Sequence, residues 1–287
     1  MSMRYCVLGA TGTLGSEIIR QLYASHDEVE IVGISRNEMR QKQLKERFPR
    51  LQMIIADIRD QEAMCMHLDN FDAVFHTAAL KHLDILEHNP EEALKTNTLG
   101  TINVANSCIK NYIPYCVFFT TDKAVAPANA YGMSKGLAEK ILWQKNRSQC
   151  ITRFKAFRWG NVLASSGSAY HSFLHTLKTE NKVHITNMGM TRFWITIEEA
   201  VKFMLSSYRT ASDSEAMLPR MKAAKVTDFV KAIAMKHGIE HYDLELVGMR
   251  PGEKIHEDIR YMEEIQETIS SDVYDTYTLD ELIGLLP

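Results

Sequence analysis

Hydrophobic residues in the first 160 positions fall into short continuous runs, separated by longer stretches in which they recur at helical spacing. The continuous runs predict six strands, at Arg4–Leu8, Glu30–Ile34, Met53–Ala56, Ala73–His76, Tyr115–Thr120 and Ile151–Arg158. The helical spacing predicts helices at Ser16–Ala24, Glu38–Phe48, Pro90–Asn111 and Ala130–Lys145. Strands that are apolar throughout are buried on both faces, as in a parallel sheet covered by helices. We therefore predict a doubly wound α/β fold.

The pattern loosens after about residue 160. Residues 161–167 are small and polar, residues 182–192 place turn residues between short β-like pieces, and residues 209–219 are expected to form a loop. Residues 248–252 contain Arg-Pro-Gly and have the chemistry of a turn. We expect a main domain at residues 1–160 and a smaller lobe at 161–287. Their boundary is blurred, because some later segments are expected to return to the sheet.

The composition is that of a globular chain of 287 residues, with 45% hydrophobic and 24% charged residues. A net charge of −3 gives no electrostatic reason to expect binding to nucleic acid or to an anionic membrane. The N-terminus lacks the apolar segment of a signal peptide, and no apolar stretch approaches the ~18 residues of a membrane-spanning helix. The five cysteines include no CxxC pair, and several lie in apolar runs. We therefore expect a cytoplasmic protein with reduced thiols and no membrane partner.

The sequence GATGTLG at residues 9–15 follows the first predicted strand and opens the first helix. Glycines at this spacing allow a tight turn, close approach of the backbone to a pyrophosphate, and close packing of helix on strand. The helix N-terminus then offers N–H donors to the phosphates. A glycine-rich turn without a ligand is the alternative. The position between strand and helix favours a dinucleotide site in a Rossmann-type fold.

The end of the second predicted strand indicates which dinucleotide is bound. An acidic residue there would accept a hydrogen bond from the ribose 2′-hydroxyl of NAD. This chain instead has Ser35 and Arg36, and an arginine suits the 2′-phosphate of NADP. Arg36 could also be a solvated residue at a helix start. NADP is favoured over NAD, and Asp57 and Ile58, after the third strand, are expected at the adenine.

Two pairs of polar residues near the fifth strand could transfer protons. Tyr131 and Lys135 lie one helical turn apart, and a neighbouring ammonium stabilises the phenolate that takes a proton from a sugar hydroxyl. Tyr-x-x-x-Lys is a loose pattern that also occurs by chance, but here it follows strand five. Asp122 and Lys123 directly follow that strand, at the edge where such sheets bind ligands. Unless they are only a surface ion pair, they form a second acid/base system, which simple alcohol oxidation does not need.

Two histidine pairs have helical spacing, His171 with His175 and His237 with His241, and could in principle bind a metal ion. Neither pair matches His-Glu-x-x-His, and no third ligand accompanies them in the sequence. We predict no metal site.

These motifs together resemble the extended short-chain dehydrogenase/reductase family and, within it, the CapD-like group of UDP-N-acetylglucosamine 4,6-dehydratases. The matching stretches run in family order from residue 9 to residue 257: GATGTLG, SRNE, ADIRD, AALKH, KTNTLGTINV, TTDKAV, AYGMSK, RWGNVLASSGS, MTRFWIT and GMRPGEKIHE. RPGEKIHE, MTRFWIT and TTDKAV are specific to the group, whereas the glycine loop and Tyr-x-x-x-Lys support only the wider family. The resemblance therefore covers nearly the whole chain.

Tyr131 decides the subgroup that the chain resembles. Retaining members of the group have methionine at this position, so the resemblance is to the soluble inverting enzymes, which also epimerise C5. Tyr170 and His171 depart from the family pattern, which affects the substrate contacts expected near residues 168–172. The chain also ends soon after the RPGEK segment, which allows for a trimmed C-terminal lobe.

The resemblance implies a dehydration framed by two hydride transfers. Tyr131, supported by Lys135 and Thr121, deprotonates the C4 hydroxyl while hydride moves from C4 to NADP. The 4-ketone acidifies the C5 proton, which Lys123 removes; Asp122 protonates the departing C6 oxygen, and hydride returns to C6. Reprotonation of C5 on the opposite face gives the inverted product. Lys123 must be neutral to act as a base, so we expect burial or nearby cations to depress its pKa.

The motifs and the resemblance together assign binding residues, and the resemblance implies a homo-oligomer. We expect the cofactor to contact Gly9, Thr11, Gly12, Thr13, Leu14, Gly15, Ser35, Arg36, Asp57, Ile58, Ala78, Ala79, Lys81, Asn97, Tyr131, Lys135 and Val162. We expect the UDP-sugar to contact Lys81, Asn161, Ser168, Arg192, Arg250 and Glu253. The arginines in this second set suit a pyrophosphate.

Two other functions stay open at this stage. A UDP-sugar C4-epimerase or reductase of the same fold needs Tyr131 and Lys135 but gives Asp122 and Lys123 no proton-transfer role. A non-catalytic NADP-binding regulatory protein is the remoter alternative, supported only by the short C-terminus. The acid and amine after strand five favour the inverting dehydratase.

Overall fold

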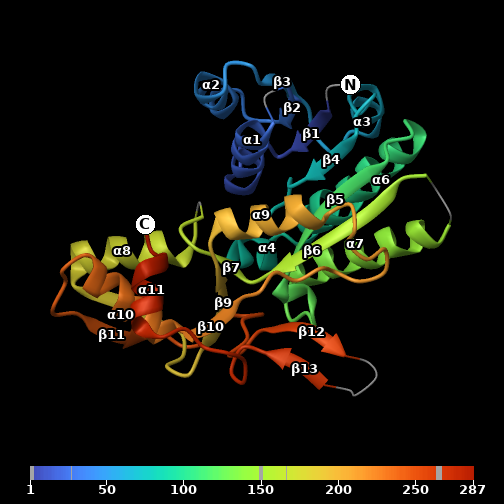
Figure 1. The fold of residues 1–287 in the computed structure, drawn as a ribbon. Coiled ribbons are helices and arrows are strands. Elements are labelled where there is room, and N and C mark those ends of the chain that lie inside the picture. Colours follow the sequence, from blue (N-terminus) through green and yellow to red (C-terminus); the bar gives the residue numbers. More distant parts are fainter. Residues whose placement is uncertain (1–2, 27, 149–150, 166, 263–266) are drawn as a thin grey trace.

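The computed structural model of the protein describes residues 3–26, 28–148, 151–165, 167–262 and 267–287. Its centre is a parallel sheet of six strands in the order β3-β2-β1-β4-β5-β6 (Figure 1). The strands are β1 (Arg4–Leu8), β2 (Glu30–Ser35), β3 (Gln52–Ile55), β4 (Ala73–His76), β5 (Tyr115–Thr121) and β6 (Arg153–Trp159). The strand order reverses beside β1, and open α/β sheets bind their ligands at such a reversal. The predicted doubly wound fold is confirmed.

Side chains of the central strands alternate between two hydrophobic cores, one on each face of the sheet. Val7, Phe75 and Val117 belong to one core, whereas Val74 and Phe118 belong to the other. The first core is covered by α1 (Thr13–Ser25), α2 (Glu38–Arg47) and α9 (Ile197–Ser207), and the second by α3 (Gln61–His67), α6 (Gly100–Lys110) and α7 (Ala130–Arg147). Burial on both faces explains why the strands read as continuous apolar runs in the sequence.

The helical stretch predicted at Pro90–Asn111 is confirmed, but it is not α-helical throughout. The structure divides this stretch into α5 (Pro90–Ala93), a π-helical turn at Leu94–Leu99, and α6, and a further short helix, α4 (Leu83–His88), precedes it. Buried Asn97 lies in the π-helical turn. Such turns widen the helix locally and often occur at functional sites. The spacing of hydrophobic residues does not reveal a π-helical turn, because the apolar face continues on both sides of it.

Residues after β6 form small sheets around a third hydrophobic core. β9 (Thr191–Ile195) pairs with β7 (Asn161–Val162) on one side and with β10 (Lys222–Lys225) on the other. The remaining elements are α8 (Ala169–Glu180), β8 (Lys182–Ile185), α10 (Val226–Lys236), β11 (Asp243–Leu246), β12 (Asp258–Met262), β13 (Glu267–Ser270) and α11 (Leu279–Leu285). β8 pairs with β11 and β12 with β13, while α8, α10 and α11 enclose the third core (Figure 1).

Part of the second half returns to the large sheet. α9 packs beside α1 (Figure 1). The loop predicted at residues 209–219 is confirmed, and its Met217 forms a β-bridge with Phe157 of β6. The turn predicted at residues 248–252 is also confirmed. It holds Gly248 and Gly252 at φ of 82° and 72°, in the left-handed region that favours glycine.

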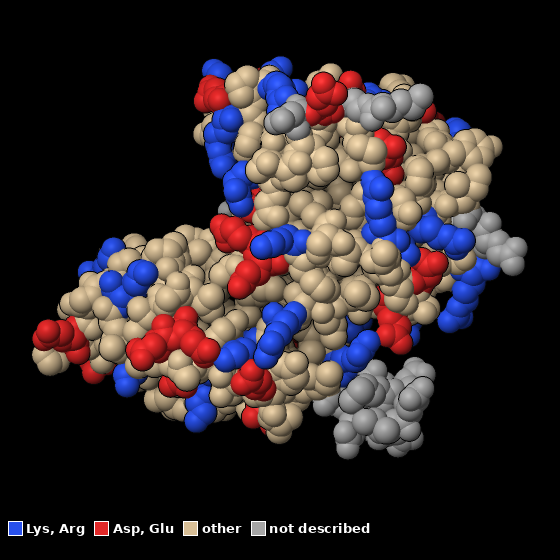
Figure 2. All heavy atoms as spheres, viewed as in Figure 1, with Lys and Arg blue, Asp and Glu red and all other residues tan. Residues whose placement is uncertain are grey.

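Charged side chains of both signs are interspersed on the face of the molecule seen in Figure 2. This mixture agrees with the net charge of −3. Within the described ranges, no helix combines the length and the apolar character needed to cross a membrane.

Candidate active site

Glycines shape the loop between β1 and α1. Gly9 has a φ of 78°, and a Cβ there would lie 2.7 Å from the backbone nitrogen of Ala78. A Cβ at Gly15 would lie 2.5 Å from the Gly9 carbonyl oxygen, and Gly12 occupies the N-cap of α1. Thr11, Thr13 and Leu14 are partly exposed around this cap. The cradle between β1, the chain after β4 and the N-terminus of α1 therefore fits a dinucleotide pyrophosphate.

Arg36 follows β2 and pairs with Asp57. Arg36 Nη1 lies 3.6 Å from Asp57 Oδ2, and Arg59 Nη2 binds the same oxygen at 2.7 Å. Burial raises the pKa of Asp57, but the hydrogen bonds from Arg59 and the charge of Arg36 outweigh it and hold that pKa below its usual value. The Arg36 side chain is 54% exposed and can therefore meet an anionic ligand. The structure thus places the Arg36 guanidinium next to Ser35. Asp57 forms ion pairs with two arginines, and Ile58 is buried.

Asn97 lies behind the loop that follows β4. Its Oδ1 accepts a hydrogen bond from the Leu80 backbone nitrogen at 2.8 Å, while its Nδ2 donates to the Leu80 carbonyl at 2.9 Å and to Ser134 Oγ at 3.0 Å. Both donors of the amide are used in these bonds. Asn97 therefore supports the loop of residues 78–81 from the protein side, and the structure does not bring it to the open face of the site.

Four residues at the end of β5 and the start of β7, Thr121, Asp122, Lys123 and Asn161, form an acid–base cluster. β5 ends at Thr121, and a single 3₁₀ turn, Asp122–Ala124, follows it. Asp122 Oδ1 accepts hydrogen bonds from Thr121 Oγ1 at 2.9 Å, from the Lys123 backbone nitrogen at 2.8 Å and from Lys123 Nζ at 3.0 Å. Asp122 is fully buried, and Lys123 Nζ also donates to Asn161 Oδ1 at 3.3 Å. The fold thus gathers these side chains at the carboxyl edge of the sheet.

Tyr131 and Lys135 lie in the first turns of α7. Tyr131 shares a hydrogen bond with Thr121, and burial raises the pKa of its phenol while the charge of Lys123 offsets part of the rise. Lys135 is buried with Nζ 3.9 Å from the centre of the Phe118 ring, and burial lowers its pKa to about 7. The structure therefore joins Tyr131 to the acid–base cluster, whereas Lys135 lies over an aromatic ring of the core.

A second carboxylate, Glu257, reaches Lys123 from the C-terminal part of the chain. Lys123 Nζ lies 3.3 Å from Glu257 Oε1, and Arg192 Nε lies 3.9 Å from the same oxygen. Glu257 is only 2% exposed. Sequence reasoning missed this residue, because it selected Arg250 and Glu253 from GMRPGEKIHE and passed over the glutamate at its end. Its position as the last residue of a group-specific motif could have indicated a role, but its contact with Lys123 depends on the fold.

The RPGEK segment is fixed over the acid–base cluster by the loop before α7. Asn129 Nδ2 donates to the Gly252 carbonyl at 2.9 Å, and Lys254 Nζ donates to the Val125 carbonyl at 2.9 Å. Gly252 has a positive φ, and a Cβ there would lie 2.7 Å from Asn129 Cβ. The segment can pass so closely only because this residue is glycine. These contacts bring residues 253–257 to the site.

Lys123 is held as an ammonium, contrary to the expectation of a depressed pKa. Burial lowers the pKa of Lys123, but the charges of Asp122 and Glu257 raise it by more, so the net shift is upward. The expectation was wrong because it considered burial and nearby cations and did not include Glu257. The pKa of Glu257 is raised as well, chiefly by burial and against the attraction of Lys123.

Arg192 and Arg250, both expected at a pyrophosphate, have different surroundings. The buried guanidinium of Arg192 donates to three backbone carbonyl oxygens, those of Thr191 at 2.7 Å, Lys254 at 2.8 Å and Ile255 at 3.0 Å. It therefore holds the RPGEK segment against β9. Arg250 is exposed, and its backbone nitrogen donates to Glu253 Oε2 at 3.3 Å. Arg250, unlike Arg192, presents its side chain at the surface.

The remaining residues expected at the substrate or the cofactor lie in different elements. Lys81, expected at both, is exposed after β4, and Val162, expected at the cofactor, forms β7 with Asn161. Ser168 is at the N-cap of α8, and its buried Oγ has no hydrogen-bond partner among the residues that the structure describes. A buried hydroxyl without a protein partner is a natural acceptor or donor for a ligand or water.

The histidine pairs make contacts within the second half of the chain. His171 Nε2 lies 3.0 Å from the Ala164 carbonyl, and His237 Nε2 lies 3.1 Å from the Tyr170 hydroxyl. In the described part of the chain, no group of three or more His, Cys, Asp or Glu side chains could hold a metal ion.

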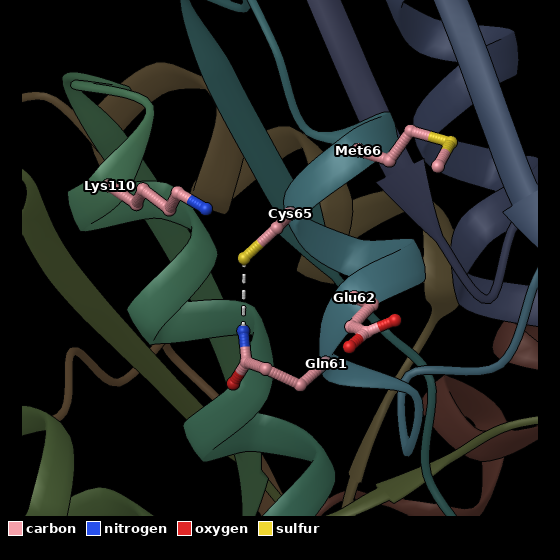
Figure 3. A pocket seen from close by; sticks show the side chains of 5 residues that line it. All are labelled: Gln61, Glu62, Cys65, Met66 and Lys110. Carbon is pink, nitrogen blue, oxygen red and sulfur yellow. Dashed lines mark hydrogen bonds between the residues drawn. The ribbon is translucent and has the colours of Figure 1, made fainter.

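A surface hollow between α3 and α6 lies apart from these residues (Figure 3). It is lined by Gln61, Glu62, Cys65, Met66 and Lys110, and Gln61 Nε2 donates to Cys65 Sγ at 3.2 Å. None of the residues expected at the active site lines it. Three other cysteines, Cys6, Cys108 and Cys116, are free thiols buried in the core, and Cys150 lies outside the described residues.

Gly132 packs the start of α7 against the acid–base cluster, and a Cβ there would overlap the Lys123 carbonyl oxygen. We expect Gly132→Ala to lower the free energy of unfolding by about 1–3 kcal/mol, because overpacking outweighs the gain in helix propensity. Urea unfolding measures this change. Gly284→Ala in α11 is the control, since a Cβ there meets no atom within 4 Å and should stabilise slightly. A Gly132→Ala protein as stable as the wild type would contradict the observed packing.

Comparison with known proteins covers nearly the whole chain. The family model described as "Polysaccharide biosynthesis protein" matches residues 5–278. An inverting UDP-N-acetylglucosamine 4,6-dehydratase of Campylobacter jejuni subsp. jejuni serotype O:2 is 35% identical over 256 residues, which are 88% of this chain and 75% of that protein. A UDP-glucose 4-epimerase of Rickettsia felis is 33% identical over 266 residues, 90% of this chain and 78% of the epimerase. The X-ray structure of Pen from Bacillus thuringiensis has a TM-score of 0.92 at 27% identity, covering 99% of this chain and 96% of that one.

Proposed function

Because the chain belongs to the polysaccharide biosynthesis protein family, an enzyme family of nucleotide-sugar dehydratases and epimerases, we propose that it is an inverting UDP-N-acetylglucosamine 4,6-dehydratase. Such a lyase makes a UDP-4-keto-6-deoxy-N-acetylhexosamine, here for surface glycan biosynthesis. The observation that carries the proposal is the buried Asp122–Lys123 pair, which is linked through Thr121 to Tyr131. Dehydration needs this second acid/base pair, whereas oxidation and reduction at C4 do not.

Each proposed proton transfer starts or ends on a side chain of the acid–base cluster or on Tyr131. Tyr131 takes the proton of the C4 hydroxyl, and the charge of Lys123 favours its phenolate. Oxidation at C4 makes the C5 proton acidic, and Lys123 Nζ accepts it. Asp122, whose Oδ1 accepts from Lys123 Nζ at 3.0 Å, takes the proton from this amine and passes it to the C6 oxygen as that oxygen leaves with its bonding electrons. General acid–base catalysis of this kind contributes about 10²–10⁴-fold.

We propose that the glycine loop, Arg36 and the loop after β4 hold NADP. When bound, this cofactor accepts a hydride from C4 and supplies one to C6. Gly9 and Gly15 allow the loop to pack closely against Ala78 and against itself, and the N-terminus of α1 would then face the pyrophosphate. Arg36 is proposed to pair with the 2′-phosphate, since no acidic residue follows β2 to accept from a 2′-hydroxyl.

Arg36→Ala tests the choice of cofactor. We expect it to raise the Kd for NADP about tenfold or more and to leave the Kd for NAD nearly unchanged, because only NADP carries the phosphate that Arg36 would meet. Titration of the protein's intrinsic fluorescence with each dinucleotide measures both constants. Arg40→Ala, on the exposed side of α2, is the matched control. Equal losses for NADP and NAD would contradict the assignment of Arg36 to the 2′-phosphate.

The proposed function is tested by NMR of the product formed from UDP-N-acetylglucosamine in D₂O, without an external hydride donor. A 4-keto-6-deoxy sugar with deuterium at C5 is expected, and an inverted C5 configuration would establish the inverting subtype proposed from Tyr131. Absence of both dehydration and C5 exchange would overturn the proposal.

A UDP-sugar C4-epimerase is the second candidate, and the similarity to the Rickettsia felis epimerase favours it. That reaction would use Tyr131 and Lys135 and leave Asp122 and Lys123 without a proton to transfer. The same NMR sample separates the candidates, because an epimerase inverts C4 and leaves the C6 hydroxyl in place.

We propose that residues 1–160 bind the cofactor and carry the catalytic groups, and that residues 161–287 mainly bind the UDP-sugar. The two parts would be interleaved, since Phe193 and Met204 pack in the core of the large sheet and Glu257 reaches Lys123. The cytoplasmic location and the homo-oligomeric assembly stay predictions.

A further inference from the structure

Lys123 lies between two buried carboxylates, those of Asp122 and Glu257, which differ in the number of hydrogen bonds that they accept. Asp122 Oδ1 accepts bonds from Thr121 Oγ1 and from both nitrogens of Lys123. Glu257 Oε1 instead lies 3.3 Å from Lys123 Nζ and 3.9 Å from Arg192 Nε. The outer oxygens, Asp122 Oδ2 and Glu257 Oε2, are buried without a hydrogen-bond partner among the described residues. Buried polar atoms without a hydrogen-bond partner are uncommon, and they indicate a catalytic role or a bound ligand or water.

The charges around Lys123 favour its ammonium form, which cannot accept a proton. Lys123 must therefore pass its own proton to a neighbour before it can remove one from C5. Asp122 Oδ1 already accepts three hydrogen bonds, and Asp122 is the proposed donor to the C6 oxygen. Glu257 is the other carboxylate within reach of Nζ, and its burial disfavours the charged form.

The backbone around Glu257 is fixed independently of Lys123. The Glu257 nitrogen donates to Ser271 Oγ at 2.9 Å, and the Ser271 nitrogen donates to the Glu257 carbonyl at 2.9 Å. Ser271 Oγ lies 2.7 Å from Thr191 Oγ1 on β9. The charged groups that act on the Glu257 carboxyl are Lys123, Asp122, Arg192 and Lys254. The carboxylate is thus set at a defined place beside the amine.

We propose that Glu257 is a positioning residue that accepts the Nζ proton of Lys123 and so converts this lysine into the base for C5. An N–H bond of Nζ breaks and an O–H bond forms on the Glu257 carboxylate, and the neutral amine then takes the C5 proton. No electrons are transferred and no co-reactant is needed. This inference rests on the proposed dehydratase function, because C5 deprotonation is the step that it serves.

Glu257→Gln tests the inference, since it removes the acceptor and nearly keeps its shape. Two rates are measured separately: C4 oxidation, from cofactor reduction in a single turnover, and C5 exchange, from deuterium incorporation. We expect C5 exchange to fall at least about tenfold while C4 oxidation stays within about twofold of the wild type. Glu257→Asp, which keeps a carboxylate, should recover part of the exchange rate. Glu215→Gln, which breaks a surface pair with Arg260, is the control expected to change neither rate.

Unchanged or faster C5 exchange in Glu257→Gln would overturn the inference and make Asp122 the acceptor. An equal fall of both rates, with a lower melting temperature, would overturn it in favour of a purely structural role. The pKa of Lys123, read without substrate by NMR of the ¹⁵N-lysine-labelled protein, is expected to fall by about one unit or more in Glu257→Gln. No change in that pKa would also overturn the inference. If the wild type dehydrates no UDP-sugar, the proposed function fails, and the NMR titration still decides whether Glu257 and Lys123 are coupled.

Discussion

Replacing Tyr131 with phenylalanine is expected to lower the kcat of dehydration by about 10³-fold and to leave the KM for UDP-N-acetylglucosamine nearly unchanged. The substitution keeps the ring and removes only the hydroxyl, which is hydrogen-bonded to Thr121. Without this hydroxyl the C4 proton loses its proposed acceptor, so the first step is blocked. C4 oxidation and C5 exchange should therefore fall together.

Stopped-flow absorbance of the reduced cofactor and deuterium incorporation at C5 measure the two steps. Tyr112→Phe is the matched control, because Tyr112 is 71% exposed and lies outside the proposed site. Unchanged melting temperatures would show that neither variant acts through the fold. A Tyr131→Phe enzyme that oxidises C4 within about tenfold of the wild type would contradict the assignment of Tyr131 as the base.

The strands of the large sheet could be predicted because both of their faces are buried. β1 and β4 coincide with the predicted residues, and the other four strands differ from the prediction by one or two residues at one or both ends. The family could also be predicted, since its motifs are local runs of residues in a fixed order. The match over residues 5–278 and the 35% identity to the Campylobacter jejuni enzyme confirm that resemblance.

The features of the acid–base cluster that the sequence did not predict depend on contacts between distant segments. Asp122 and Lys123 are adjacent in the chain, so their pairing could be expected, but Glu257 meets Lys123 only after the RPGEK segment folds over Asn129. The charge state expected for Lys123 was wrong for the same reason. A pKa follows from all charges around a group, and spacing along the chain reports only the nearby ones.

Arg192 and Asn97 show the same limit for binding residues. Both are residue types that suit ligands, and both were expected to contact one. In the structure, however, Arg192 donates to the carbonyl oxygens of Thr191, Lys254 and Ile255. The Leu80 peptide and Ser134 occupy the amide of Asn97. Residue type thus indicated which side chains lie near the site, while their orientation was decided by the packing of loops around them.

Lys123→Met is expected to separate the two halves of the reaction. Methionine fills the space of the lysine stem without its charge, and the C4 step depends on Tyr131, so cofactor reduction should persist within about tenfold. C5 exchange and formation of the 6-deoxy product should fall by about 10³–10⁴-fold, because the proposed base is gone. Asp122 and Glu257 would then be buried without their shared cation, and the pKa of Glu257, already raised by burial, should rise further because Lys123 no longer lowers it. The stability of the variant should therefore be highest at low pH and be lost as pH rises through the raised pKa of Glu257.

Lys140→Met on the exposed side of α7 is the control, and thermal melts from pH 5 to pH 9 report the stability change. A Lys123→Met protein that still forms the 6-deoxy sugar at a rate near that of the wild type would remove the acid–base cluster from the chemistry at C5. A C4-epimerase would keep both cofactor reduction and turnover in this variant, because it needs no base at C5. A dehydratase with this substitution would keep cofactor reduction and lose turnover. Loss of Tyr131, by contrast, would stop both the epimerase and the dehydratase reaction. Lys123 is therefore the residue whose replacement separates the two candidate functions within one protein.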